Sequence, residues 1–325
     1  MRMNRTVQSL PVMKTLNAVA ICLLLAGHLV SPTAADFEIK NEAEFKKIVP
    51  SQAKVEKLAG EMKFLEGPVW VPSGGGYLIF SDIPADELKK WTEQGGVTTF
   101  RQPSNKANGN TLDLAGRLVT AEHAAHRVSY TATDGTVKAL VENHEEKSLN
   151  SPNDVVVKSD GTIWFTDPDY GLEGRPKEQE GNYVYRFHPR TKSLKPVAKD
   201  FDKPNGLCFS PDEKKLYVAD SGKPRHIRVF AVQKNGTLQG GEVFCAIDKG
   251  GPDGIRCDGA GRVFSSAGDG VHIFAPDGSL IGKILVPESP ANLCFGGGDG
   301  RTLFITARKS LYAIRLWTEA AQRPK

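Results

Sequence analysis

The sequence lacks the features of several protein classes. Its formal net charge of +4 is small for 325 residues, and its basic residues are scattered rather than interleaved with aromatic residues. Binding to nucleic acid therefore has no electrostatic support. The repeats described below show no 3.6-residue periodicity, which argues against helical repeat folds. With 39% hydrophobic and 25% charged residues, the composition is that of a soluble globular protein with a sizeable core.

Long apolar runs are absent except at the N-terminus. Arg2, Arg5 and Lys14 precede a run from Leu16 to Val30, and small residues follow it up to Ala35. This order predicts a secretory signal peptide at residues 1–35 and a secreted or periplasmic mature chain without a stable membrane span. Three residues interrupt the run: Asn17, Gly27 and His28. A membrane anchor is the alternative, although the run is shorter than the ~20 apolar residues of a membrane helix.

What the sequence does contain is a repeated unit. A tight polar turn is followed by a short apolar strand, a glycine-containing turn and a second apolar strand, most clearly at residues 151–168. The unit occurs six times, and its leading residues, 39 to 52 residues apart, are Glu66, Asn108, Asn153, Asn205, Asp253 and Asn292. Repeats of this length with only β-type hydrophobicity are typical of propeller blades. The sequence therefore predicts an all-β, six-bladed β-propeller.

The last repeat has room for only three strands before the chain ends. The unassigned segment that could supply a fourth strand lies before the first repeat, and we expect Val55 to Leu58 to close the ring. Closure removes the open edge of an incomplete blade. The expected organisation is a signal peptide at 1–35, a lead segment at 36–52, a propeller at 53–318 and a tail at 319–325.

Four cysteines follow the predicted signal peptide: Cys208, Cys245, Cys257 and Cys294. Three of them occupy matching places in the first strand of successive repeats, which predicts small buried apolar residues rather than a disulfide framework or a metal knuckle. A bridge between Cys245 and Cys257 stays open, because an exported protein meets oxidising conditions.

The leading residues are the candidates for chemistry. The inner strand of every blade lines the central channel of a propeller, so residues just before it gather at one mouth of that channel. All six leading residues offer oxygen ligands, which suits Ca²⁺ better than zinc. Asn-Gly and Asp-Gly pairs are also ordinary turn chemistry, the role we favour for Asn108 and Asn292. Glu66 is a poor turn former, so its position indicates coordination.

Four of these turns resemble the signature turns of the gluconolactonase and regucalcin (senescence marker protein) family. They are Glu66-Gly-Pro, Ser151-Pro-Asn153-Asp154, Pro204-Asn205-Gly206 and Gly251-Pro-Asp253-Gly254, and the similarity extends from about Lys54 to Leu316. Members of that family are six-bladed propellers with a divalent cation in the channel. The resemblance thus implies the same fold and a metal-dependent hydrolase.

The resemblance also implies roles for individual residues. The expected metal ligands are Glu66, Asn153, Asn205 and Asp253, and Asp253 is the expected proton acceptor. The cofactor implied is Ca²⁺, with Zn²⁺, Mn²⁺ or Mg²⁺ as alternatives. The implied reaction is hydrolysis of a sugar lactone, in which the cation polarises the ring carbonyl and Asp253 activates water. The expected partner is thus a small-molecule lactone.

Substrate contacts are expected from Asn108, His123, Asn153 and Asp154. Regucalcin-type members carry an arginine where this chain has Ser151, so that contact is not transferred. The Glu122-His123 pair is instead similar to bacterial gluconolactonases, although a surface position for His123 is an equal alternative. Three aromatic residues are further candidates for lining the pocket: Trp91, Trp164 and Tyr170.

Two other functions fit the same residues. A phosphotriester hydrolase could use the same calcium site, with Asp253 attacking phosphorus. The more distant diisopropylfluorophosphatase shares the four-residue calcium site of the family. In a non-catalytic binding propeller, the ring of oxygens would hold a structural ion. The sequence leaves the natural substrate, the physiological metal and the oligomeric state open.

Overall fold

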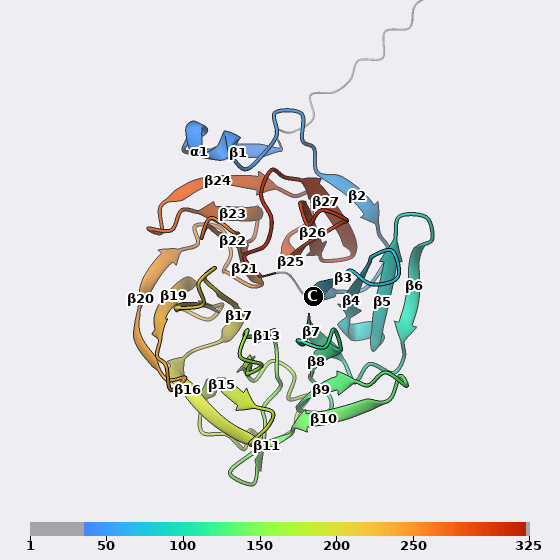
Figure 1. Ribbon diagram of the computed structural model, residues 1–325, viewed down its shortest axis with the longest axis vertical. Coiled ribbons are helices and arrows are strands. Elements are labelled where there is room, and N and C mark those ends of the chain that lie inside the picture. Colours follow the sequence, from blue (N-terminus) through green and yellow to red (C-terminus); the bar gives the residue numbers. More distant parts are fainter. Residues whose placement is uncertain (1–35, 323–325) are drawn as a thin grey trace, which may run out of the picture. The chain divides into compact units, whose positions relative to one another are not determined.

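The computed structural model describes residues 36–322, and the predicted signal peptide lies outside this range. Six antiparallel sheets are arranged around a central axis, with their first strands innermost (Figure 1). The prediction of a six-bladed β-propeller is therefore confirmed. No helix within the described range is long and apolar enough to cross a bilayer.

Each blade is a meander of neighbouring strands. From the inside outward, the first three blades are β3 (Leu65–Val71), β4 (Tyr77–Asp82), β5 (Glu87–Thr92) and β6 (Gly96–Arg101); β7 (Ala107–Leu112), β8 (Leu118–Glu122), β9 (Arg127–Thr131) and β10 (Val137–Val141); and β13 (Val155–Val157), β14 (Ile163–Asp167), β15 (Asn182–His188) and β16 (Ser193–Phe201). A 3-10 helix, η1 (Ile83–Ala85), follows β4, and a small hairpin of β11 (Asn143–His144) and β12 (Lys147–Ser148) joins the second and third blades.

The remaining blades repeat this order, with additions from the N-terminal segment. They are β17 (Pro204–Phe209), β18 (Lys215–Asp220), β19 (His226–Val232) and β20 (Leu238–Ala246); β21 (Ile255–Cys257), β22 (Val263–Ser266), β23 (Gly270–Phe274) and β24 (Leu280–Leu285); and β25 (Pro290–Gly296), β26 (Thr302–Ala307) and β27 (Ser310–Arg315), with β2 (Glu56–Ala59) outermost.

The N-terminal strand closes the ring as predicted. β2 pairs antiparallel with β27, with Glu56 opposite Ala313 and Lys57 opposite Tyr312. The strand begins one residue later than the Val55 to Leu58 expected from the sequence. The first and last parts of the propeller are thus held together by backbone hydrogen bonds, and the sixth blade has four strands.

The lead segment carries structure that the sequence analysis missed. β1 (Phe37–Ile39) adds a fifth strand to the fifth blade by pairing with β24. The short helix α1 (Glu42–Lys46) follows it, with the side chain of Asn41 accepting a hydrogen bond from the Glu44 amide at 3.2 Å. Phe45 of this helix is buried in the core of the last two blades.

Hydrophobic cores lie between neighbouring blades of the described chain. Trp164 and Phe209, for example, meet edge to face between the third and fourth blades, with centroids 5.5 Å apart. The four cysteines of the described chain are buried and free of disulfides. The expectation of small buried apolar residues is therefore confirmed.

Removing the closing strand should destabilise the propeller strongly. Deleting residues 53–59 leaves β27 as an open edge, so we expect aggregation and a loss of at least about 5 °C in Tm, equivalent to ~2 kcal/mol in a domain of this size. Deleting residues 36–40 is the control, because it removes β1 but leaves the fifth blade with four strands. Differential scanning calorimetry and light scattering measure both. An equal loss in the two variants would contradict the closure role.

Candidate metal and active site

The leading residues open the six inner strands, so they gather at one end of the channel. Five are almost fully buried: Glu66, Asn108, Asn153, Asn205 and Asn292. Asp253 is partly exposed, but its Oδ1 atom is buried. The carboxylates of Glu66 and Asp253 act electrostatically on one another. The structure therefore places the residues predicted from the repeat on one face.

Buried acids at the ends of the second strands hold the turns that carry these residues. Asp167 accepts hydrogen bonds from the amides of Asn150 and Ser151, at 2.9 and 2.8 Å, just before Asn153. Asp220 does the same for the amides of residues 202 and 203, just before Asn205. Because a carboxylate is a strong acceptor of backbone N–H groups, each acid fixes the entry to an inner strand.

Glycines after the leading residues let neighbouring blades approach closely. The Gly206 amide donates to the carbonyl of Asp253 at 3.0 Å, and the Gly109 amide donates to the carbonyl of Asn153 at 2.7 Å. A Cβ atom on Gly206 would lie 2.2 Å from the Asp253 oxygen. The Asn-Gly pairs thus serve contacts between blades as well as turn formation.

Glu66 is held by two hydrogen bonds. Its Oε2 atom accepts from the Gly67 amide at 2.7 Å and from Asn292 Nδ2 at 2.9 Å. Burial raises the pKa of Glu66 to about 7, although the hydrogen bond from Asn292 lowers it. The negative charge of Asp154 adds to the increase. The Oδ1 atom of Asn292 also accepts a hydrogen bond from the Leu293 amide of its own strand. Asn292 therefore has the expected local backbone contact and also supports Glu66.

Asp253 has an oxygen without a partner. Burial, then the charges of Glu66 and Asp154, raise the pKa of Asp253 well above its ordinary value, and a hydrogen bond from Asn205 opposes this. Among the described residues, none hydrogen-bonds Asp253 Oδ1. A buried acceptor without a donor is unfavourable, so this oxygen is available to a cation, a water or a substrate.

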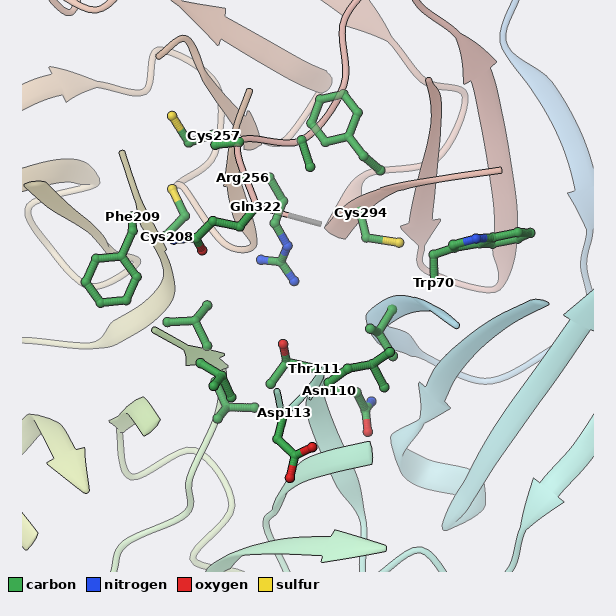
Figure 2. A pocket seen from close by; sticks show the side chains of 18 of the residues that line it. Trp70, Asn110, Thr111, Asp113, Cys208, Phe209, Arg256, Cys257, Cys294 and Gln322 are labelled. Atoms are coloured by element: carbon green, nitrogen blue, oxygen red, sulfur yellow. The ribbon is translucent and has the colours of Figure 1, made fainter. Parts of the chain in front are cut away.

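One partly buried arginine lies below this ring. Arg256 points into a cavity of about 390 Å³ along the inner strands (Figure 2), and its Nη1 atom lies 3.3 Å from Oδ2 of Asp154. The other oxygen of Asp154 accepts from the Val155 amide at 3.0 Å. The cavity belongs to the channel beneath the leading residues, and Ala320 to Gln322 contribute to its lining.

The charges of this cluster do not balance within the described chain. When ionised, Glu66, Asp154 and Asp253 carry three negative charges, and Arg256 supplies one positive charge. Uncompensated buried charge is costly. A divalent cation would balance the cluster, and carboxylate and amide oxygens are ligands that Ca²⁺ accepts. The residues present therefore fit a divalent cation held by Glu66, Asn153, Asn205 and Asp253.

Asn108 and His123 meet beside the ring. Asn108 Nδ2 lies 3.1 Å from Nε2 of His123, and burial lowers the pKa of His123 to about 4. The imidazole of His123 is therefore neutral near pH 7, and its Nε2 atom accepts a hydrogen bond from the side-chain amide of Asn108. His123 is buried rather than a surface residue. Oδ1 of Asn108 is buried without a hydrogen-bond partner among residues 36–322, so it can accept from a ligand.

The other residues predicted to contact substrate or line the pocket differ in how far they are buried. Asp154 is fully buried and already has partners inside the chain, and its contact with substrate stays a prediction. Trp164 is fully buried, and Trp91 packs against Phe304 with centroids 5.5 Å apart, so both belong to the core. Tyr170 is 48% exposed and is the member of the aromatic set that can meet a ligand.

A second acidic group lies in the fifth blade. Ligand atoms of Asp248, Asp269 and His272 lie within 4.8 Å of one another. The buried ammonium of Lys283 is 2.8 Å from Asp248 and 3.3 Å from Asp269, so this group already has a cation. The cluster at the channel mouth is the better candidate metal site, because its charge is not balanced.

The chain is similar to known gluconolactonases in sequence and in structure. The chain is 35% identical to the gluconolactonase of Zymomonas mobilis over 301 residues, covering 83% of each chain. The gluconolactonase of Xanthomonas campestris has a similar structure, with a TM-score of 0.82 and 34% identity over 87% of this chain and 95% of that one. Regucalcin of Agrobacterium tumefaciens, a calcium-binding protein, shares the fold with a TM-score of 0.68 and 22% identity, over 82% and 98% of the two chains.

A family model agrees with these likenesses. The model described as SMP-30/Gluconolactonase/LRE-like region matches residues 64–309. This range contains all six leading residues and the inner strands that they open. The chain therefore belongs to the SMP-30/gluconolactonase/LRE-like family.

Proposed function

We propose that this protein hydrolyses sugar lactones at a calcium site formed by Glu66, Asn153, Asn205 and Asp253. The observation that supports this proposal most strongly is the cluster at the channel mouth. There, three carboxylates act on one another, the one guanidinium pairs with Asp154, and Asp253 Oδ1 has no partner in the described chain. Membership of a family with named gluconolactonases supports a lactone as the substrate.

The side chains suit such a reaction. A calcium ion supplies Lewis-acid polarisation of the lactone carbonyl. Asp253 takes a proton from water as the water oxygen bonds to the carbonyl carbon. The ring C–O bond then breaks and the ring oxygen receives the proton, which gives the open hydroxy acid. Burial and the neighbouring carboxylates raise the pKa of Asp253, and a bound cation would favour its ionised form, which is the form that accepts a proton.

Neighbouring groups prepare the site for a hydroxylated ring. Oδ1 of Asn108 can accept a hydrogen bond from a substrate hydroxyl, since its amide nitrogen is bound to His123. Asn292 and the Gly67 amide hold Glu66 from the side. Arg256 offsets the charge of Asp154 from below. These contacts hold the carboxylates of Glu66 and Asp154 in position beside the proposed metal.

Metal removal tests the proposal. The chain from Asp36 onward is assayed on glucono-, galactono- and xylonolactones and on a phosphotriester, before and after chelation. We expect lactone hydrolysis to fall at least about 100-fold without metal, by analogy with the loss of one strong electrostatic contact, and to return with Ca²⁺. Zn²⁺, Mn²⁺ and Mg²⁺ are compared in the same assay, and metal content is measured independently.

The results of these assays distinguish the three candidate functions. Full lactonase activity in protein shown to be metal-free would refute the calcium dependence. Faster hydrolysis of the phosphotriester than of any lactone would assign the site to the other reaction. Ca²⁺ binding that raises the Tm without any hydrolysis would favour a structural ion in a binding propeller.

A further inference from the structure

The connection between β14 and β15 reaches from the third blade across the candidate site. Ser151 Oγ donates to the carbonyl of Pro168 at 2.6 Å and accepts from the Gly171 amide at 2.8 Å. A Cβ atom on Gly171 would lie 2.7 Å from the ring of His123. The start of this connection is therefore fixed between the turn before Asn153 and the histidine of the second blade.

Tyr170 lies between these two anchors and extends to the fourth blade. Its phenol lies within reach of the Ser221 side chain, and the Lys203 ammonium lies 5.4 Å from its ring centroid. The Ser221 hydroxyl donates in turn to the carbonyl of Pro252, the residue immediately before Asp253. This chain of contacts places the phenol beside the turn that presents the proposed base.

We propose that Tyr170 is a further substrate-contacting residue, whose hydroxyl turns from Ser221 Oγ when the ligand binds and donates its hydrogen bond to an oxygen of the lactone held against Asp253. This inference rests on the proposed lactonase function. Tyr170 is 48% exposed, whereas Asn153 and Asn205 are only 5% exposed, so the tyrosine is more accessible to solvent than these two leading residues.

The chemistry of the side chain suits this contact. Burial, then the negative charge of Asp253, raise the pKa of Tyr170 to about 12, so the phenol is a donor throughout the range in which lactones can be assayed. An aromatic ring also offers an apolar face to the C–H groups of a sugar, while its hydroxyl keeps a polar contact. Lys203 is paired with Asp169, so its charge is partly compensated.

Tyr170→Phe tests the contact, with Tyr77→Phe as the matched control. Tyr77 begins β4, lies at the far end of its blade and interacts with Lys90 through its ring. For Tyr170→Phe we expect kcat/KM on the best lactone to fall about fivefold or more, as for the loss of one hydrogen bond. We expect the inhibition constant of the matching unreactive lactam to rise by a similar factor. Calcium affinity should stay unchanged, and Tm should fall by no more than about 4 °C, as for the loss of the phenol's contact with Ser221. Tyr77→Phe should match the unmodified protein in kcat/KM and calcium affinity.

The outcomes separate this inference from the function on which it rests. An unmodified protein that hydrolyses lactone, together with a Tyr170→Phe variant of equal kcat/KM and equal lactam affinity, overturns the tyrosine contact alone. A fall in kcat/KM that is fully explained by a loss of calcium affinity or of folded protein also overturns it, because Tyr170 would then act only by holding the loop. An unmodified protein without lactonase activity overturns both proposals.

Discussion

Asp253→Asn is expected to lower kcat about 10²- to 10⁴-fold at saturating Ca²⁺, the usual contribution of a general base. The substitution keeps the size of the side chain but removes its proton affinity. Glu66→Gln is the matched variant, because it also removes one buried carboxylate charge from the same cluster. Both should weaken calcium binding, since affinity for a hard cation depends on ligand charge. At saturating Ca²⁺, however, Glu66→Gln should retain far more activity.

Calcium titration, kcat at saturation and Tm are measured for both variants. An Asp253→Asn variant that is folded, saturated with Ca²⁺ and as fast as the unmodified protein would exclude Asp253 as the base. A purely structural ion makes a different prediction. Both variants would then lose Tm in proportion to lost metal binding, and the activity of each would follow its folded fraction.

The repeat made the architecture predictable, but short segments whose partners are distant in the sequence were not predicted. β2 was located within one residue because it continues the alternation of a strand and fills a gap in the sixth blade. β1 has only three residues, and its partner β24 lies more than two hundred residues away. α1 is a five-residue helix, but Asn41 followed by Glu44 is a capping signal that could have revealed it.

The site was predictable where the repeat marked it, and its supporting contacts were not. Glu66 stands out because it replaces a turn former at a leading position, and Asp253 shares that register. Arg256 and Asp154 are separated by 102 residues and Asn292 and Glu66 by 226, so no local pattern joins them. One signal was present for Arg256, a charge between Ile255 and Cys257 in an apolar inner strand.

Calcium should stabilise the protein more at pH 8 than at pH 5.5. In the metal-free protein the pKa of Glu66 is raised to about 7 and that of Asp253 is raised as well. A carboxyl group with a raised pKa binds more protons in the folded than in the unfolded state, so its contribution to the free energy of unfolding falls as pH rises through this range. Ca²⁺ needs the ionised forms. Each pH unit below the pKa of Glu66 should therefore cost about a factor of ten in apparent calcium affinity.

The measurement is the increase in Tm on adding Ca²⁺ at each pH, rather than the Tm itself. His123 has a lowered pKa of about 4, so its burial destabilises the folded state below its ordinary pKa and acts in the opposite direction. Asp167, with a pKa raised to about 7 by burial, contributes with and without Ca²⁺. Subtracting the Tm without Ca²⁺ from the Tm with Ca²⁺ removes the contributions of His123 and Asp167. Glu66→Gln should flatten the dependence, because one of the two titrating ligands is gone, and an increase in Tm that is equal at both pH values in the unmodified protein would contradict a calcium site built on these carboxylates.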